Sequence, residues 1–300
     1  MQQVKNREHP VAAAGGAARP RERAANGPAP HDPAVAPAGP LVAVDGVTKR
    51  YNGRTVLDGI RFAVERGEAF GIIGPNGSGK STLLNLISGV EAPDGGRILL
   101  DGRPVADHPR KELARWLAVL QQEAVLAEGF TVRDVVEMGR YPFQNWFGDE
   151  KDDPSPLIDG ILDHLQLAPL AERRVDGLSG GERQRTALGK VMAQEPRLLL
   201  LDEPTTYLDI GHQAMLLDRI RKWRQETGLT VIAVLHDLNL AAMFCDRLLL
   251  IRDGRQLAVG PPEDVVTGDL IRGAFGIEPV IFPHPQTGVP QLLLGGSPDR

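Results

Sequence analysis

The sequence predicts an α/β fold, in which buried strands alternate with helices, and three observations lead to this prediction. The apolar run Ala69–Ile73 is followed by a glycine-rich turn and then by the start of a helix near Thr82. The leucine run Leu198–Leu201 lacks alternation with polar residues, which is typical of a strand buried on both faces. Residues 230–235 form another strand-like run, and apolar residues at helical spacing precede it.

The glycine-rich turn has the chemistry of a phosphate-binding loop. It matches the pattern G-x-x-x-x-G-K-[S/T], and its residues are Gly74, Pro75, Asn76, Gly77, Ser78, Gly79, Lys80 and Ser81, with Thr82 next. Glycines let successive N–H groups point into one concavity, and the helix that follows adds the positive end of its dipole. Lys80 then reaches the β- and γ-phosphates of a triphosphate, and the Ser81 hydroxyl ligates Mg²⁺. A turn without a ligand is the weaker interpretation, because the strand and the helix that the motif requires both flank it.

Length and composition restrict the class of protein. The 300 residues allow one large domain or two modest ones, and the net charge of -5 gives no basic excess that would favour nucleic acid as a partner. Cys245 is the only cysteine, so no intrachain disulfide can form. No window reaches the ~18 to 20 uninterrupted apolar residues of a membrane span. We therefore expect a soluble protein that reaches a membrane only through a partner.

The N-terminal part is expected to contain a tail and then strands. Residues 1–40 are rich in Ala, Pro, Gly and Arg without a periodic apolar face, and we expect them to be disordered. Residues 41–51 and 60–64 have strand patterns, and Asn52-Gly53 is a turn signal. Tyr51 precedes the phosphate loop, where its ring either stacks on adenine or merely covers a sheet edge.

The middle of the chain changes from strand to helix. A hairpin pattern at residues 94–102, with a strand at 97–100, and a buried strand at 117–120 come first. The apolar period of a helix then begins behind Thr131, at Val132, Val135, Val136 and Met138, and a second helix is expected at 157–165. Residues 124–194 are therefore predicted to be a helical insertion in the α/β frame. Its aromatic segment, residues 141–147, is either an interface or packed inside the insertion.

The α/β frame resumes after the insertion. The leucine strand ends in Asp202 and Glu203, and the strand at 230–235 ends at His236. The buried face of the helix between them is expected at Leu216, Leu217, Ile220 and Trp223. A terminal hairpin is expected at 248–252 and 256–259, with the domain covering residues 41–275 and a C-terminal extension at 276–300.

A second phosphate-recognition device follows the first in the chain. Residues 178–185 read Leu-Ser-Gly-Gly-Glu-Arg-Gln-Arg, so two glycines open a helix whose N-terminus attracts anions. Its candidate ligand residues are Ser179, Gly180, Gly181 and Glu182. A phosphate loop alone indicates a ligand class and leaves the function open, whereas two such devices in one chain are more specific.

With these two phosphate-binding motifs in one chain, the sequence resembles the ATP-binding subunits of ABC transporters, whose signature motif is similar to LSGGQ. This chain has Glu182 where glutamine is commonest. The resemblance covers residues 41–275 and implies a P-loop NTPase core of the RecA-like type, with an antiparallel β subdomain and an inserted α-helical subdomain. It also implies ATP, Mg²⁺ and a head-to-tail homodimer, in which the signature of one chain closes over the ATP held by the phosphate loop of the other.

The resemblance assigns roles to single residues. Gln122 resembles the glutamine that ligates Mg²⁺ and senses the membrane partner, with Gln121 as the second choice. Asp202 resembles the aspartate that orients Mg²⁺, and Glu203 the carboxylate that polarises the attacking water; both could instead be helix-capping carboxylates. Neighbouring residues at a strand end diverge, so one can face the metal and the other the γ-phosphate.

Two further positions complete this set. Tyr207-Leu208-Asp209 matches the loop that crosses the dimer interface, which places Asp209 near a nucleotide. His236 resembles the histidine that contacts the γ-phosphate, although a lone histidine after a strand is more often an ordinary polar residue.

The residues around these motifs resemble one branch of the family. Residues 203–213, 139–142 and 235–239 look like the ATPases of bacterial iron-siderophore importers, whose relatives serve haem and cobalamin. This implies a peripheral subunit on the cytoplasmic side of the cell membrane that drives permease subunits to release a ferric siderophore, delivered by an extracytoplasmic binding protein. The alternatives are a non-transport ABC ATPase and an exporter ATPase. Neither the two ATPase units nor the long coiled coil of many non-transport members occurs in this sequence.

Overall fold

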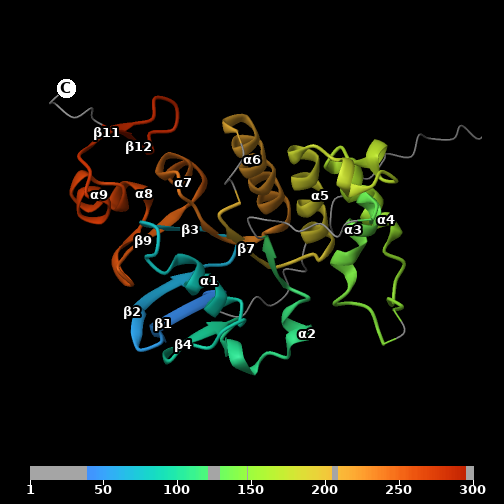
Figure 1. Ribbon diagram of the computed structural model, residues 1–300, viewed down its shortest axis with the longest axis horizontal. Helices are drawn as coiled ribbons and strands as arrows, with labels where there is room; N and C mark the ends of the chain where they lie inside the picture. The colour runs from blue at the N-terminus through green and yellow to red at the C-terminus, as the bar shows by residue number, and fades with distance from the viewer. Residues whose placement is uncertain (1–38, 121–128, 147, 205–208, 295–300) are drawn as a thin grey trace, which may run out of the picture.

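Two sheets face each other at the centre of the molecule, with helix α1 (Lys80–Ile87) between them (Figure 1). The computed structural model describes residues 39–120, 129–146, 148–204 and 209–294. The larger sheet has six strands in the order β10-β9-β3-β8-β7-β6. These strands are β3 (Ala69–Ile73), β6 (Leu117–Leu120), β7 (Leu198–Asp202), β8 (Thr230–Val234), β9 (Arg247–Arg252) and β10 (Arg255–Gly260).

All strands of this sheet except β10 run in the same direction. β3 lies between β8 and β9, and β7 lies between β8 and β6, each in a parallel pair. Because parallel strands end at the same edge, the segments after β3, β7 and β8 come together there. The phosphate loop, the pair Asp202-Glu203 and His236 follow these three strands, so the fold itself collects them.

The smaller sheet is antiparallel, with the order β2-β1-β4-β5. Its strands are β1 (Val42–Tyr51), β2 (Arg54–Val64), β4 (Gly95–Leu100) and β5 (Arg103–Pro104). The turn between β1 and β2 is Asn52-Gly53, and both residues have positive φ, as the Asn-Gly signal predicts. The faces of the two sheets meet through stacked rings, with the centroids of Phe62 and Phe70 4.9 Å apart.

The side chains of β7 show how the larger sheet is buried on both faces. Leu198 and Leu200 belong to the core shared with the smaller sheet and α1, whereas Leu199 and Leu201 belong to the core on the helical side. That side is covered by the predicted helical region and by α6 (Figure 1). The helices there are α3 (Val132–Glu137), α4 (Ser155–His164), α5 (Gly180–Ala193) and α6 (Ile210–Thr227).

The chain continues beyond the hairpin that was expected to end the fold. The predicted hairpin is present as β9-β10, but it is not terminal. After β10 come α8 (Pro262–Val265), α9 (Gly268–Phe275), β11 (Pro279–Pro283) and β12 (Pro290–Leu294), none of which was predicted. The hairpin β11-β12 lies against α7 (Leu238–Phe244). Asn239 joins them, because its side chain donates to Leu292 O at 3.1 Å and accepts from Leu292 N at 2.7 Å.

The sequence located most elements, with shifted ends. β3 and β6 have the predicted bounds, the antiparallel pair β9-β10 is confirmed, and the four apolar positions predicted for α6 are all buried. β2 starts at Arg54 instead of residue 60, and the short α2 (Arg110–Leu113) was not predicted. No helix within the described ranges combines the length and the apolar character that a membrane crossing needs.

Some predictions fall on residues that the structure does not describe. These are the tail at residues 1–38 together with Gln121, Gln122, Phe147, Tyr207 and Leu208. The boundaries 41–275 and 276–300 also stay predictions.

Candidate functional site

An open pocket of about 450 Å³ lies where β3, β7 and β8 end, within the ~300 to 1,000 Å³ range that is usual for ligand sites. Its walls combine the phosphate loop with residues from the ends of β1, β7 and β8. The lining residues are Tyr51, Val56, Asn76, Gly77, Gly79, Lys80, Ser81, Thr82, Glu203 and His236. Gly74, Pro75 and Ser78 are not among them, and the last of these is buried. The structure therefore brings Tyr51, most of the predicted phosphate loop, Glu203 and His236 into one place.

Two glycines fix the shape of the phosphate loop. Gly74 has a φ of 149°, and a Cβ there would lie 2.0 Å from Ile251 O. Gly79 has a φ of 102°, and a Cβ there would lie 2.6 Å from Leu57 Cδ2. Neither position accepts a side chain, because the loop packs directly on neighbouring backbone and core atoms. Gly79 also precedes α1, whose first turn has no side-chain cap and no acidic residue, so its N–H groups are available to an anion.

Lys80 is held at the base of this loop. The residue is 5% exposed, and its Nζ donates hydrogen bonds to Gly74 O at 2.9 Å and Pro75 O at 3.0 Å. Burial lowers the pKa of Lys80, and the negative charges of Glu203 and Asp202 partly offset that effect. Lys80 thus has no carboxylate bonded to it in the described structure, and a bound phosphate would supply the missing counter-charge.

Ser81 and Asp202 form a pair of oxygen ligands beside Lys80. The Ser81 hydroxyl donates to Asp202 Oδ1 at 3.1 Å, although the two residues are far apart in the sequence. Burial raises the pKa of Asp202, while the Ser81 hydrogen bond lowers it. A hydroxyl and a carboxylate next to a phosphate site suit Mg²⁺, which takes few protein oxygens and completes its shell with substrate phosphates and water. These residues therefore fit the predicted metal.

Glu203 and His236 meet across the pocket. His236 Nε2 lies 2.6 Å from Glu203 Oε1, and both side chains are partly exposed toward the pocket. Glu203 has a φ of 51°, an uncommon left-handed conformation for a residue that is not glycine. Its N–H donates to Val234 O at 3.2 Å, which anchors this turn to the end of β8. The predicted divergence of Asp202 and Glu203 is confirmed, because one contacts Ser81 and the other His236.

Tyr51 lines the opposite side of the pocket. Its ring is 39% exposed, and its hydroxyl donates to Glu91. The ammonium of Lys49 lies 5.2 Å from the ring centroid and 3.4 Å from Glu91 Oε2. Burial and then Glu91 raise the pKa of the Tyr51 hydroxyl. The ring is therefore held at the pocket edge, where the predicted stacking on a base would place it.

The signature segment, residues 178–185, does not reach this pocket. None of Ser179, Gly180, Gly181 or Glu182 lines it, and Ser179 instead caps α5. The Ser179 hydroxyl accepts from Glu182 N at 3.4 Å, and Ser179 N donates to Glu182 Oε2 at 2.7 Å. The structure therefore adds a capping box to the predicted anion-binding helix N-terminus. The box uses the N–H groups of Ser179 and Glu182, and phosphate binding by this segment stays a prediction.

Asp209 starts α6 next to the signature segment. Its carboxylate accepts from His212 N and lies 2.8 Å from His212 Nδ1. The His212 ring in turn lies against Gly181, where a Cβ would be 3.0 Å from the ring. Asp209 is thus remote from the pocket of its own chain and close to the start of α5.

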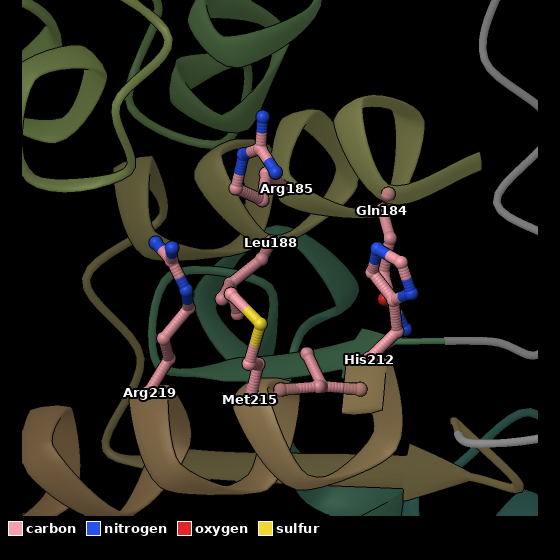
Figure 2. Close-up of a pocket in the computed structure, with 8 residues that line it drawn as sticks. Gln184, Arg185, Leu188, His212, Met215 and Arg219 are labelled. Atoms are coloured by element: carbon pink, nitrogen blue, oxygen red, sulfur yellow. The ribbon is translucent and has the colours of Figure 1, made fainter. Parts of the chain in front are cut away.

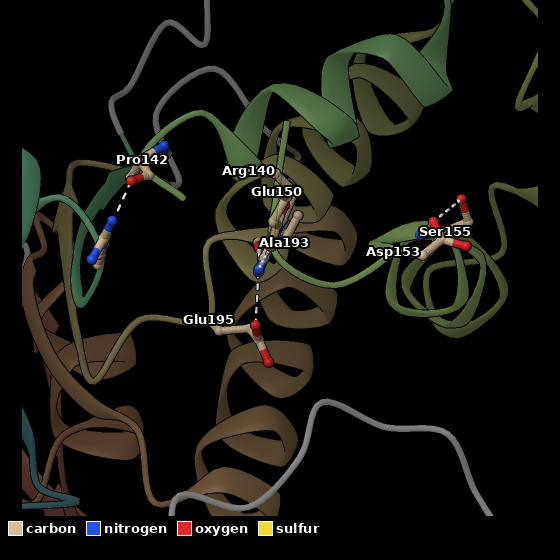
Figure 3. A network of polar contacts seen from close by, with 8 residues as sticks. Arg140, Pro142, Glu150, Asp153, Ser155, Ala193 and Glu195 are labelled. Carbon is tan, nitrogen blue, oxygen red and sulfur yellow. Dashed lines mark hydrogen bonds and ion pairs between the residues drawn. The ribbon is translucent and has the colours of Figure 1, made fainter. Parts of the chain in front are cut away.

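A separate exposed surface carries the aromatic segment. Tyr141 is 58% exposed and Trp146 is 97% exposed. Arg140 holds the start of this segment, because its buried guanidinium bonds to Glu150, to Glu195 at 2.7 Å and to Ala193 O at 2.7 Å (Figure 3). Its guanidinium also lies 4.0 Å from the Phe143 ring centroid.

Sequence reasoning missed some residues of the site. Val56 lines the pocket and Glu91 holds Tyr51, but neither belongs to a recognisable motif. The predicted roles of Gln122, and of Gln121 as its alternative, lie outside the described residues.

The site defines a nucleotide-binding core of the P-loop class, because a strand, a phosphate loop and a helix follow one another and a neighbouring parallel strand ends in carboxylates.

The family model described as ABC transporter matches residues 57–206. "Probable siderophore transport system ATP-binding protein YusV" of Bacillus subtilis (strain 168) is 39% identical over 85% of this chain and 93% of its own length. "Hemin import ATP-binding protein HmuV" of Streptomyces coelicolor is 42% identical over 90% of this chain and 95% of its own.

A solved structure gives the same result. CbiO1 from Clostridium perfringens, described as part of the ABC transporter complex cbiONQ, superposes with a TM-score of 0.69 and 27% identity, covering 79% of this chain and 96% of its own. The chain therefore belongs to the ABC transporter family, and it is an ATP-binding ATPase of that family.

Proposed function

We propose that this chain is the ATP-hydrolysing subunit of an importer for iron(III)-siderophore complexes. The observation that carries the proposal is one pocket in which Lys80, the pair Ser81–Asp202 and the pair Glu203–His236 meet. The names of its relatives support the transported class, since one is named for siderophores and one for hemin.

Each residue of the pocket has a separate task in this proposal. The first-turn N–H groups of α1 and the Lys80 ammonium bind the phosphates, and Tyr51 stacks on the base. Ser81 and Asp202 hold Mg²⁺, which neutralises charge on the β- and γ-phosphates when it is bound. Glu203 orients the attacking water, and His236 fixes the orientation of that carboxylate at 2.6 Å.

The position of the signature segment supports a head-to-tail homodimer. Ser179–Glu182 stand at a helix N-terminus that does not line the pocket of their own chain. In the proposed dimer they close over the ATP of the second chain, with Asp209 at the same interface. Each ATP is then enclosed by residues from two chains, so that hydrolysis requires dimer closure.

The aromatic segment supports a permease as the membrane partner. A 97% exposed tryptophan next to a 58% exposed tyrosine is unusual for a free surface, because rings of this size mark protein interfaces. Arg140 anchors the segment to α5, so a helix docked there would sense movements of α5. The chain would then lie peripherally on the cytoplasmic side of the membrane, with an extracytoplasmic binding protein delivering the siderophore to the permease.

Charge at Trp146 tests this docking surface. Trp146→Glu should abolish siderophore-dependent iron uptake in cells while ATP hydrolysis by the purified subunit stays within twofold of the unmodified chain. Leu294→Glu is the matched control, because Leu294 is also an exposed apolar residue, 70% exposed on β12. Equal loss of uptake in both variants, or loss of ATPase activity with a lower melting temperature, would contradict docking at the aromatic segment.

Haem is the second candidate substrate, because the hemin relative has 42% identity and the siderophore relative has 39%. A strain that lacks this gene, complemented with the chain or with Glu203→Gln, distinguishes the two. Uptake of a ⁵⁵Fe-labelled siderophore that depends on Glu203 supports the proposal. Restored growth on haem alone, without siderophore uptake, would replace siderophore by haem.

A further inference from the structure

Gln184 connects α5 to the residue that follows Glu203. Its side-chain Nε2 donates a hydrogen bond to Pro204 O at 3.1 Å. Pro204 is buried and comes directly after Glu203 at the end of β7. A side chain of the signature segment therefore contacts the turn that carries the proposed catalytic carboxylate.

The Glu203-Pro204 turn depends on such contacts. Glu203 has a φ of 51°, and a residue other than glycine keeps this conformation only where its surroundings hold it. Its N–H bonds to Val234 O, its carboxylate meets His236, and Gln184 holds the next carbonyl. Loss of any one contact gives the turn freedom to relax and to move the carboxylate.

α5 and α6 are also joined at their N-termini. Figure 2 shows Gln184 pointing from α5 toward α6, and His212 pointing back from α6 toward α5. Both residues line the groove between the helices, and the His212 ring lies against Gly181. Gln184 thus connects α5 to the Glu203-Pro204 turn, and His212 connects the start of α5 to Asp209.

We propose that Gln184 is a positioning residue that couples the signature segment of a chain to that chain's own Glu203. The inference rests on the proposed dimer, in which the signature segment contacts the partner's ATP while Glu203 serves the chain's own. Closure over one ATP then sets the carboxylate at the other. Gln184 links the two ATP sites through a single hydrogen bond, without touching either nucleotide.

Three variants separate this role from general stability. Gln184→Met keeps the length of the side chain and removes the donor, whereas Gln184→Lys retains a donor. Gln194→Met is the control, because Gln194 ends the same helix and donates to the carbonyls of Ala114 and Leu117, far from Glu203 in the fold. In the full-length chain, Gln184→Met should lower kcat about tenfold or more, with KM and the MgATP Kd within twofold. Gln184→Lys should recover most of kcat, and Gln194→Met should leave it within twofold.

Heterodimers test whether Gln184 positions the Glu203 of its own chain or that of the partner. When one chain carries Ser179→Arg, the only working site uses the Glu203 of that chain and the signature of the other. Gln184→Met placed on the Ser179→Arg chain should then lower turnover about tenfold, and placed on the other chain it should change turnover less than twofold. Differently tagged chains allow each heterodimer to be purified.

The outcomes distinguish the two proposals. Equal losses in both heterodimers, or an unchanged kcat in Gln184→Met beside normal turnover of the unmodified chain, would overturn the coupling role and leave the proposed function intact. An unmodified chain that never dimerises with ATP would overturn both.

Discussion

Replacing Glu203 by glutamine changes one charge at the end of β7 and almost nothing else. Glutamine has the same length and keeps an oxygen that can accept from His236, which lies 2.6 Å from the present carboxylate. The N–H bond to Val234 O and the Gln184 bond to Pro204 O do not involve the side chain of Glu203, so the turn keeps its supports. The substitution therefore tests the carboxylate's chemistry and leaves the backbone in place.

The expected loss of turnover in Glu203→Gln follows from the proposed role of the carboxylate. A positioned group that accepts a proton or orients water contributes about 10²- to 10⁴-fold, which corresponds to about 2.7 to 5.4 kcal/mol of transition-state stabilisation. ATP binding should be no weaker, because Lys80 and the α1 N–H groups remain and one negative charge near the γ-phosphate is removed. We expect kcat to fall at least about 100-fold with an unchanged or lower MgATP Kd.

The assay compares steady-state phosphate release with nucleotide binding by equilibrium dialysis. Light scattering with MgATP should show dimers that persist in Glu203→Gln and dissociate in the unmodified chain as ATP is consumed. The melting temperature serves as the control for folding. A turnover within threefold of the unmodified chain, with normal folding, would refute the role of Glu203.

The other predictions test the loop, the signature segment and the stability of the frame. Lys80→Ala should weaken MgATP binding about tenfold or more, since a charge-assisted hydrogen bond contributes about 1.5 to 3 kcal/mol; an unchanged affinity in equilibrium dialysis would contradict the loop assignment. The Ser179→Arg variant should bind ATP but hydrolyse none. Mixing it with the Lys80→Ala variant should restore part of the turnover, because one site then has an intact phosphate loop and an intact signature segment. Mixtures that stay inactive would contradict a site built from two chains. Asp101→Asn should cost about 1 kcal/mol in urea unfolding at pH 7, a value reduced for partial exposure. Burial alone would raise the pKa of Asp101, but ion pairs with Arg66 and Arg197 lower it overall. The stabilisation is thus present above the unfolded-state pKa of about 4 and is lost as the pH falls below it. The difference in unfolding free energy between Asp101→Asn and the unmodified chain should therefore shrink below pH 4. A difference that stays constant with pH would contradict the ion-pair explanation.

The parts of the site that the sequence predicted share one property. The phosphate loop, the end of β7 and the end of β8 can each be recognised from the local sequence, by a motif or by a polar residue after a buried run. Parallel strands then bring these ends together without further information, because they finish at one edge of the sheet. Local patterns therefore marked these positions, the family resemblance assigned Asp202, Glu203 and His236 their roles, and the sheet topology explains why they lie in one site with Lys80.

The parts that sequence reasoning missed depend on contacts between distant segments. Tyr51 and Glu91 are 40 positions apart, and Gln184 reaches a backbone carbonyl 20 positions away, with no pattern to connect either pair. The hairpin β11-β12 was missed for another reason. Proline occurs at Pro279, Pro283 and Pro290, and proline weakens any strand prediction because it cannot donate a ladder hydrogen bond. All three lie at strand ends, where that loss is tolerated.

The N-terminus of α5 carries the signature segment, which lies at the interface of the proposed dimer. Ser179 and Glu182 have the spacing of a capping box, and the structure forms it, so two N–H groups at this helix end are satisfied within the chain. The hydrogen bond from Ser179 N is the main reason why the pKa of Glu182 is lowered, and this hydrogen bond favours the ionised carboxylate. In the proposed dimer an incoming γ-phosphate meets this negative charge, but the Glu182 carboxylate bonds to Ser179 N, so that the N–H groups of Gly180 and Gly181 are outside the capping box. Glutamine at this position would cap the helix without the repulsion. If the proposed dimer forms, we expect Glu182 to disfavour the binding of free anions at α5.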